Sequence, residues 1–216
     1  MSLSGELERV AAALAARRSP DARRAVEEQL LRLRETGLAQ AALRVGELAP
    51  DFDLPDVATG RAVSLTGLLD RGPVVVNFVR GFWCPYCNIQ MRALARVEQR
   101  LTALGAALLA ITAQPLESSL NGIAVSPLPY PLLHDSGGRV ATLFGIAFPV
   151  SPDVARIYEL SGIPTTRTLA GETILPIPAS YVIARDGTVT YAFVDVDHTR
   201  RAEPEALVAA VEATRA

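Results

Sequence analysis

The chain has 216 residues, of which half are hydrophobic and a fifth are charged, and its formal net charge is −2. A chain of this size and composition can bury one sizeable core, as an ordinary soluble globular protein does. The near-neutral charge gives no electrostatic reason to expect a nucleic acid or an anionic membrane as a partner.

The N-terminal stretch does not resemble a secretory signal, because Glu6, Glu8 and Arg9 interrupt it before an apolar segment can form. No apolar run approaches the length of a membrane span. We therefore expect a cytoplasmic protein in a reducing compartment. There a close pair of cysteines is more often catalytic or metal-binding than a structural disulfide. The chain has only two cysteines, Cys84 and Cys87.

Residues 1–44 are predicted to be helical. Apolar residues recur at three- and four-residue spacing over residues 3–14 and form one stripe. Residues 19–21 (Ser-Pro-Asp) supply an N-cap, a proline at the first position and an acid in the first turn of a second helix. We expect an amphipathic arm that packs on the main domain or, in a homodimer, on a second copy, rather than a separate functional domain.

The rest of the chain alternates between strands and helices. Residues 73–79 form a continuous apolar, β-branched run, which is typical of a strand buried on both faces. Residues 84–104 are predicted to be helical, and residues 106–112 form the next buried strand. This order predicts an α/β fold with a mixed sheet between helices. The other elements that we expect are a strand at 61–65, a turn of helix at 66–70, a strand at 131–134, helices at 138–144 and 154–160, a hairpin at 180–194 and a helix from 204 to 214.

Cys84 and Cys87 form a Cys-Pro-Tyr-Cys motif where the buried strand turns into a helix. A cysteine at the start of a helix meets free N–H groups and the positive end of the helix dipole, which lower its pKa. Pro85 stands at a first-turn position, where its missing N–H costs nothing. Cys87 lies one turn further in on the same face. This spacing predicts that Cys84 is the exposed nucleophile and that Cys87 is the shielded thiol that resolves a mixed disulfide.

Two other interpretations of the cysteine pair are less favoured. A zinc site needs two further ligands, and the chain offers only His134 and His198, so we expect no metal and no other cofactor. Two inert buried cysteines would leave their place at the strand-to-helix junction without a reason.

Residues near the motif allow further predictions. Arg80 either holds a thiolate or an anionic substrate near the dithiol, or is a solvated turn residue. Trp83 is expected to form a flat cover over the disulfide. His198 and the pair Arg200-Arg201 are expected to be a polar approach to the last helix, with a role in the site as the less favoured alternative.

Four segments carry a resemblance to a known family: residues 46–55, residues 77–87 with the Cys-Pro-Tyr-Cys motif, residues 176–187 and residues 195–204. The first three are similar to the peroxiredoxin (alkyl hydroperoxide reductase and thiol-specific antioxidant) family, and the last resembles the tail of its CxxC-containing subgroup. The resemblance implies a thioredoxin-like three-layer α/β/α sandwich with a mixed central sheet, and antioxidant activity. It divides the chain into an N-terminal helical extension, residues 1–44, and a thioredoxin-like domain, residues 45–216.

The cysteine segment departs from the pattern of that family. Typical peroxiredoxins place a proline seven residues and a threonine three residues before the peroxidatic cysteine, and neither Cys84 nor Cys87 has both. In the CxxC subgroup the second cysteine aligns with the peroxidatic one, which favours Cys87, whereas local geometry favours Cys84. We expect Cys84 to attack disulfides first and leave open which cysteine attacks peroxide.

Pro178 stands where the family has a late arginine that stabilises the peroxide and the thiolate. Residues 178–181 (Pro-Ala-Ser-Tyr) instead resemble the cis-proline segment of thioredoxins, which faces the dithiol and offers backbone hydrogen bonds to a substrate. The alternative is a proline that begins an edge strand. Asn77 occupies about the place of the buried acid of thioredoxins and cannot accept a proton, so proton transfer to Cys87 is expected to rely on water.

The preferred interpretation is a thiol-dependent antioxidant oxidoreductase that reduces hydroperoxides through a Cys84–Cys87 dithiol/disulfide cycle. A thioredoxin- or glutathione-type donor would reduce the disulfide again and so maintain redox homeostasis. One alternative is a general thiol–disulfide oxidoreductase that acts on disulfide substrates without useful peroxidase activity. The other is a non-catalytic redox sensor or adaptor that acts through the N-terminal helices.

Overall fold

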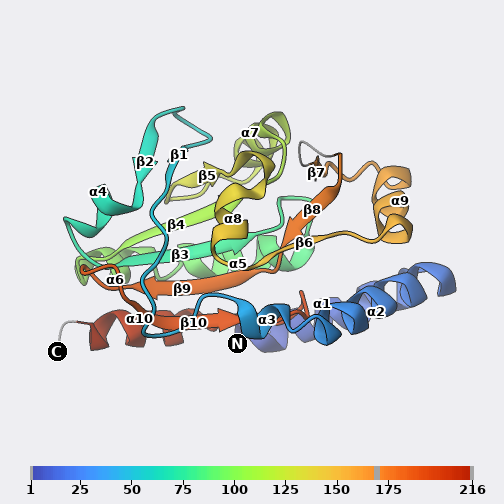
Figure 1. Cartoon of the computed structure of the whole chain (residues 1–216), viewed down its shortest axis with the longest axis horizontal. Coiled ribbons are helices and arrows are strands. Elements are labelled where there is room, and N and C mark those ends of the chain that lie inside the picture. Colours follow the sequence, from blue (N-terminus) through green and yellow to red (C-terminus); the bar gives the residue numbers. More distant parts are fainter. Residues whose placement is uncertain (1, 168–170, 215–216) are drawn as a thin grey trace.

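The computed structural model describes residues 2–167 and 171–214. Its centre is a five-stranded mixed sheet made of β3 (Val74–Val79), β4 (Ala107–Thr112), β5 (Leu132–His134), β9 (Ala179–Ile183) and β10 (Val189–Val194) (Figure 1). The strand order is β10-β9-β3-β4-β5. Strands β3, β4 and β5 are parallel, and β9 runs antiparallel to both of its neighbours. The predicted buried run at residues 73–79 is therefore the central strand of the sheet.

Alternate side chains of β3 enter two separate cores, because helices cover both faces of the sheet. Val75 and Val79 face one core, whereas Val76 and Phe78 face the other. This arrangement confirms the predicted α/β sandwich with a mixed central sheet. The first core contains side chains of α1 (Leu3–Arg17), α5 (Pro85–Ala95), α6 (Glu98–Ala103) and α10 (Pro204–Ala213), and the second contains side chains of α2 (Pro20–Glu35), α4 (Leu65–Leu69), α8 (Arg139–Leu143) and α9 (Pro152–Leu160).

The predicted continuous helix at residues 84–104 is wrong, since the chain forms two helices there. Helix α5 ends before Arg96, and Val97 adopts φ −106° and ψ −2° before α6 begins. The side chain of Val97 is buried at this break. The strand predicted at 61–65 is β2 (Ala62–Ser64), and the short helix α3 (Leu38–Ala41) lies within the predicted helical residues 1–44. Elements that the sequence did not reveal are α7 (Leu116–Val125), the strand β1 (Asp53–Pro55) that pairs with β2, and a three-stranded sheet of β6 (Ala147–Pro149), β8 (Thr173–Pro176) and β7 (Thr166–Arg167).

The N-terminal helices pack on the sheet domain of the same chain, which is the first of the two predicted arrangements. The Glu203 carboxylate, just before α10, accepts hydrogen bonds from the backbone N–H groups of Leu3 and Ser4 at 3.0 and 2.8 Å. Gln29 of α2 accepts a hydrogen bond from the backbone N–H of Ser151, at 2.7 Å, where α9 begins. Each of the two long helices is therefore held by hydrogen bonds to a residue far away in the sequence. No helix of the described residues is both long and apolar enough to cross a membrane.

Candidate active site

The two cysteines lie at the junction of β3 and α5, as the sequence predicts. Cys84 is the N-cap residue of α5, Pro85 stands in its first turn, and Cys87 follows there. The backbone N–H of Cys84 donates to the carbonyl oxygen of Gly81 at 3.1 Å and closes the turn after β3. Gly81 has a φ of +138°, and a Cβ at this position would lie 2.0 Å from Oε1 of Gln114. The turn therefore requires glycine.

Both sulfurs are buried, because Cys84 is 1% exposed and Cys87 is 0% exposed. The predicted exposure of the Cys84 sulfur is therefore wrong. The start of a helix is open only where nothing packs against it. Here α1 packs against α5, and both cysteines belong to the core that these two helices share.

The sulfur of Cys87 accepts hydrogen bonds from two directions. The backbone N–H of Arg80 lies 3.4 Å from this sulfur, and Nη2 of Arg201 lies 3.5 Å from it. Burial opposes ionisation, but the hydrogen bond from the Cys84 thiol, the charge of Arg201 and the Arg80 amide together hold the pKa of Cys87 well below its usual value. Cys87 is therefore the cysteine that ionises first.

Cys84 has the opposite tendency. Burial raises the pKa of the Cys84 thiol well above its usual value, and the hydrogen bond to Cys87 and the charge of that sulfur add to the effect. Cys84 therefore keeps its proton and donates a hydrogen bond to the Cys87 sulfur. Local geometry predicted that Cys84 has the lower pKa, and the contacts of the two sulfurs contradict that prediction. Among the described hydrogen bonds, Arg201, which comes from a distant loop, donates to Cys87 and not to Cys84.

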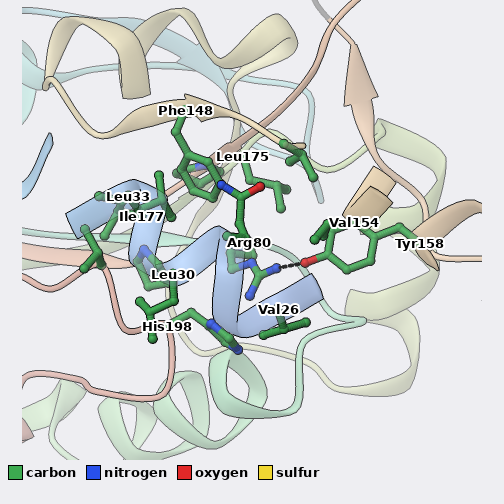
Figure 2. Close-up of a pocket in the computed structure, with 15 residues that line it drawn as sticks. Val26, Leu30, Leu33, Arg80, Phe148, Val154, Tyr158, Leu175, Ile177 and His198 are labelled. Atoms are coloured by element: carbon green, nitrogen blue, oxygen red, sulfur yellow. Dashed lines mark hydrogen bonds between the residues drawn. The ribbon is translucent and has the colours of Figure 1, made fainter. Parts of the chain in front are cut away.

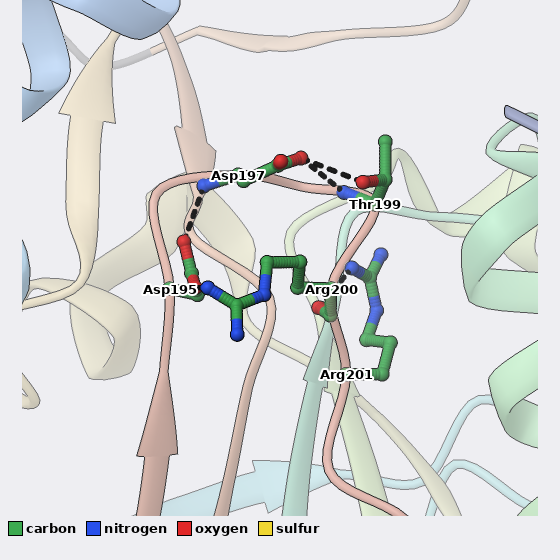
Figure 3. A network of polar contacts seen from close by, with 5 residues as sticks. All are labelled: Asp195, Asp197, Thr199, Arg200 and Arg201. Carbon is green, nitrogen blue, oxygen red and sulfur yellow. Dashed lines mark hydrogen bonds and ion pairs between the residues drawn. The ribbon is translucent and has the colours of Figure 1, made fainter. Parts of the chain in front are cut away.

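Arg201 reaches Cys87 from the loop between β10 and α10. Its side chain is buried, and its Nη1 donates to the backbone carbonyl oxygens of His198 and Arg200, the latter at 2.7 Å. The neighbouring Arg200 points elsewhere and forms an ion pair with Asp195 at 2.8 Å (Figure 3). The preferred prediction, a mere polar approach to the last helix, is therefore wrong for Arg201.

Short-range hydrogen bonds hold this loop in shape. The Asp197 carboxylate accepts from the backbone N–H and the hydroxyl of Thr199, at 3.0 and 2.7 Å (Figure 3). The backbone N–H of Asp197 in turn donates to the Asp195 carboxylate at 2.9 Å. Such side-chain turns are typical of Asp and Thr and fix the backbone from which Arg201 projects. The only sequence signal for this role was the resemblance of residues 195–204 to the tail of the CxxC subgroup.

The Arg80 side chain is buried, so the alternative of a solvated turn residue is wrong. Its guanidinium carbon lies 4.7 Å from the centre of the Trp83 ring, and its Nη2 donates to the hydroxyl of Tyr158. The Trp83 and Tyr158 rings lie 5.3 Å apart. Trp83 therefore covers the Arg80 guanidinium, a contact that the sequence did not indicate. Its role as a cover over a disulfide stays a prediction.

A small pocket lies beside Arg80 (Figure 2). Its volume is about 40 Å³, and its walls are mostly apolar. Arg80 and Tyr158 line one side, and α2 closes another. The other lining residues that the picture labels are Leu33, Phe148, Val154, Leu175, Ile177 and His198.

The predicted cis peptide bond at Pro178 is wrong, because the described part of the chain contains none. The chain passes from β8 to β9 without a tight turn between paired strands, which is where a cis prolyl bond is typically used. Pro178 does not begin an edge strand either, since β9 lies inside the sheet. It does line the pocket beside Arg80.

Asn77 is fully buried and takes part in a polar cluster of three side chains. Its Oδ1 accepts from the Ser180 hydroxyl at 2.9 Å, and Nε2 of Gln90 donates to the same hydroxyl oxygen at 3.2 Å. None of the hydrogen bonds described here joins Asn77 to a cysteine. Water-mediated proton transfer to Cys87 therefore stays a prediction.

The described residues contain no group of three or more His, Cys, Asp and Glu side chains that could hold a metal ion. His198 packs edge-on against Tyr86, with the ring centres 5.5 Å apart. Burial, together with the charges of Arg80 and Arg201, lowers the pKa of His198 well below its usual value. The imidazole is therefore neutral at neutral pH and adds no charge to the site.

Comparisons with known proteins agree with this geometry. The family model described as AhpC/TSA matches residues 45–192. Peroxiredoxin Q from rice chloroplasts is 32% identical over 148 residues, which are 68% of this chain and 58% of the relative. A Mycobacterium tuberculosis protein named as a candidate peroxiredoxin is 31% identical over 104 residues, 48% of this chain and 67% of that protein.

A search of solved structures finds the same fold. The crystal structure of the peroxidoxin BcpB from Mycobacterium tuberculosis aligns with 81% of this chain and 99% of its own, with a TM-score of 0.62 and 24% identity. A thiol:disulfide interchange protein of the DsbE type from Chlorobium tepidum covers 81% of this chain and all of its own, with a TM-score of 0.56 and 21% identity. At these identities the likeness concerns the fold alone.

Proposed function

Because the chain belongs to the AhpC/TSA family, we propose that Cys87 is the cysteine that attacks a hydroperoxide and that Cys84 resolves the product. The protein is a thiol-dependent oxidoreductase of the peroxiredoxin type. The assignment of roles rests on one observation above all. The Cys87 sulfur accepts hydrogen bonds from the Arg80 amide and the Arg201 guanidinium, and these favour the thiolate.

The reaction follows from these contacts. The Cys87 thiolate attacks one oxygen of the hydroperoxide, the O–O bond breaks, and the departing alkoxide takes a proton and leaves as an alcohol or water. Cys87 becomes a sulfenic acid. The Cys84 sulfur then attacks the Cys87 sulfur, which forms the disulfide and releases water. An external dithiol of the thioredoxin type, or glutathione, supplies the two electrons that restore both thiols.

The two guanidinium groups have separate tasks in this scheme. Arg201 stabilises the attacking thiolate directly. Arg80 contacts the sulfur through its backbone and lines the pocket with its side chain, where its Nε has no partner among the described atoms. A hydroperoxide that reaches the Cys87 sulfur beside Arg80 supplies an acceptor for that N–H, and the hydrogen bond strengthens as negative charge develops on the leaving oxygen.

Stopped-flow oxidation of the reduced protein by hydrogen peroxide tests the assignment. Cys84→Ser should still react in one step, because the serine hydroxyl keeps a donor beside Cys87, but it should stop at the sulfenic acid. Cys87→Ser should lose the fast reaction altogether. The assignment is wrong if Cys87→Ser reacts as fast as the unsubstituted protein, or if the latter reacts no faster than free cysteine at the same pH.

General thiol–disulfide exchange has weaker support from this site. Cys84, the cysteine that would attack a protein disulfide first, is buried and has a raised pKa. We propose further that the enzyme acts in the cytoplasm, where external thiols keep it reduced. The division at residues 44 and 45 and a homodimer stay predictions, and the mass of the protein in solution tests the second.

A further inference from the structure

Because both sulfurs are buried, a hydroperoxide needs a hollow beside them. The pocket next to Arg80 is lined by two residues, Arg80 and His198, that also take part in the surroundings of the dithiol. Arg80 bonds to Cys87 through its backbone, and His198 packs on Tyr86 and accepts from Arg201. Neither cysteine lines the pocket itself, so Arg80 and His198 are the residues that join the pocket to the surroundings of the sulfurs.

The outer wall of this pocket comes from the N-terminal extension. Val26, Gln29, Leu30 and Leu33 of α2 face it, and of these only Leu33 is buried (Figure 2). The half-buried side chains of Val26 and Leu30 thus stand between the pocket and the solvent. Gln29 holds the helix in place through the backbone N–H of Ser151.

The volume of the pocket sets a limit on what can bind. A cavity needs roughly 10–15 Å³ of this kind of space for each water molecule. The volume of about 40 Å³ therefore holds about three or four atoms of the size of oxygen or carbon. Hydrogen peroxide and the smallest alkyl hydroperoxides fit, whereas a hydroperoxide with an aromatic ring does not.

We propose that helix α2 is the size filter of the peroxide pocket, with Leu30 and Val26 as the residues that exclude bulky hydroperoxides. The substrates are then hydrogen peroxide and hydroperoxides with one or two carbon atoms. This inference rests on the proposed function, but it concerns access to Cys87 and is measurable without turnover. The unpartnered Nε of the buried Arg80 is the group that receives the peroxide oxygen.

A second hollow competes as a route to the site. It borders Arg201, has a volume of about 440 Å³ and is walled by Leu7 and Ala11 of α1. Entry from this side would place no limit on size, because the hollow is about ten times larger. The two routes therefore predict opposite substrate preferences.

The first experiment compares second-order rate constants for oxidation by cumene hydroperoxide and by hydrogen peroxide. We expect the unsubstituted protein to react at least about tenfold more slowly with the bulky compound. Leu30→Ala should raise the ratio of the cumene hydroperoxide constant to the hydrogen peroxide constant about tenfold, because it opens the outer wall of the pocket. Leu31→Ala is the matched control, since Leu31 lies on the same helix with 55% of its surface exposed and does not line the pocket.

The second experiment separates this inference from the proposed function. In Cys84→Ser, the remaining thiol at Cys87 is alkylated either by iodoacetamide or by a maleimide with a bulky aromatic substituent. Leu30→Ala should accelerate the bulky reagent relative to iodoacetamide, and Leu31→Ala should not. This readout keeps its meaning even if the protein has no peroxidase activity.

The inference fails if the unsubstituted protein accepts cumene hydroperoxide as readily as hydrogen peroxide. It also fails if Leu30→Ala leaves the bulky-to-small ratio unchanged in both experiments. A change in the ratio on Ala11→Trp but not on Leu30→Ala would place the route on the α1 side instead. If peroxide oxidation is slow for every variant while the alkylation ratio still responds to Leu30→Ala, the proposed function fails and the filter stands.

Discussion

A thiolate in a protein interior needs hydrogen-bond donors or a positive charge nearby, because burial by itself favours the neutral thiol. Cys84 and Cys87 are equally buried and stand in the same helical turn, so position alone does not separate them. Arg201 separates them, because its guanidinium contacts Cys87. In the proposed mechanism this side chain, together with the Arg80 amide, favours Cys87 as the sulfur that attacks.

Arg201→Met should raise the pKa of Cys87, because it removes both a charge and a hydrogen-bond donor from the thiolate. The fraction of thiolate at neutral pH falls accordingly, so oxidation by hydrogen peroxide should slow by about tenfold, or ~1.4 kcal/mol. The rate should recover as pH rises toward the usual pKa of a thiol. Ultraviolet absorbance of the thiolate during a pH titration measures the same change directly.

Arg200→Met is the control for this prediction. Arg200 is the neighbouring arginine, its side chain is two-thirds exposed, and its ion pair with Asp195 is a surface contact. We expect Arg200→Met to react with hydrogen peroxide at a rate within about twofold of that of the unsubstituted protein, and with the same pH dependence. Equal losses in the two variants would show that the loop, and not the charge on Cys87, is responsible.

At the scale of elements, the junction of β3 and α5 is determined by short-range chemistry. An apolar β-branched run forms the buried strand, a glycine turns the chain, and Pro85 starts the helix. All of these signals are local, which is why the sequence predicted the strand, the helix start and the position of both cysteines. The break at Val97 was not predicted, because the apolar spacing continues through it; the Val97 side chain is buried there.

Gly81→Ala should destabilise this junction. The substitution places a Cβ 2.0 Å from Gln114 Oε1 and also strains a backbone with a φ of +138°. We expect a loss of about 2–3 kcal/mol in the free energy of unfolding, measured with urea, together with slower peroxide oxidation. Gly60→Ala is the matched control, because Gly60 also has a positive φ but nothing within 4 Å of the added Cβ. Similar losses in both variants would mean that backbone strain, and not the contact with Gln114, matters.

At the scale of the whole molecule, the N-terminal helices close the site that the rest of the chain builds. Helix α1 packs on α5, which carries the cysteines, and α2 walls the pocket beside Arg80. The Glu203 carboxylate accepts hydrogen bonds from the first N–H groups of α1, where the helix dipole also favours a negative charge. The arm is therefore joined to the same loop region that holds Arg201.

Glu203→Ala should loosen α1, because it removes the acceptor for the backbone N–H groups of Leu3 and Ser4. We expect faster hydrogen exchange over residues 3–17 and easier proteolysis between α1 and α2. Burial opposes ionisation of Glu203, yet the hydrogen bonds from Ser4 and Leu3 hold its pKa below the usual value. A lowered folded pKa means that the contact is complete above the usual glutamate pKa and is lost as pH falls through the folded one.

Faster hydrogen exchange over residues 3–17 of α1 should therefore also appear in the unsubstituted protein at acidic pH. Glu212→Ala is the control, since Glu212 lies exposed near the other end of α10. Unchanged exchange over residues 3–17 in Glu203→Ala would show that apolar packing of Leu3 and Leu7 alone holds the arm.

The amino-acid sequence by itself determined the alternation of strands and helices, the helical arm and the place of the dithiol. These depend on periodicity, capping and turn residues within short segments. Only the tertiary structure decided that both sulfurs are buried, that Arg80 lies against Trp83 and Tyr158, and that Arg201 contacts the Cys87 sulfur. The physical reason is distance along the chain: Arg201 is 114 residues from Cys87, and no local pattern records which side chain a folded loop brings to a buried sulfur.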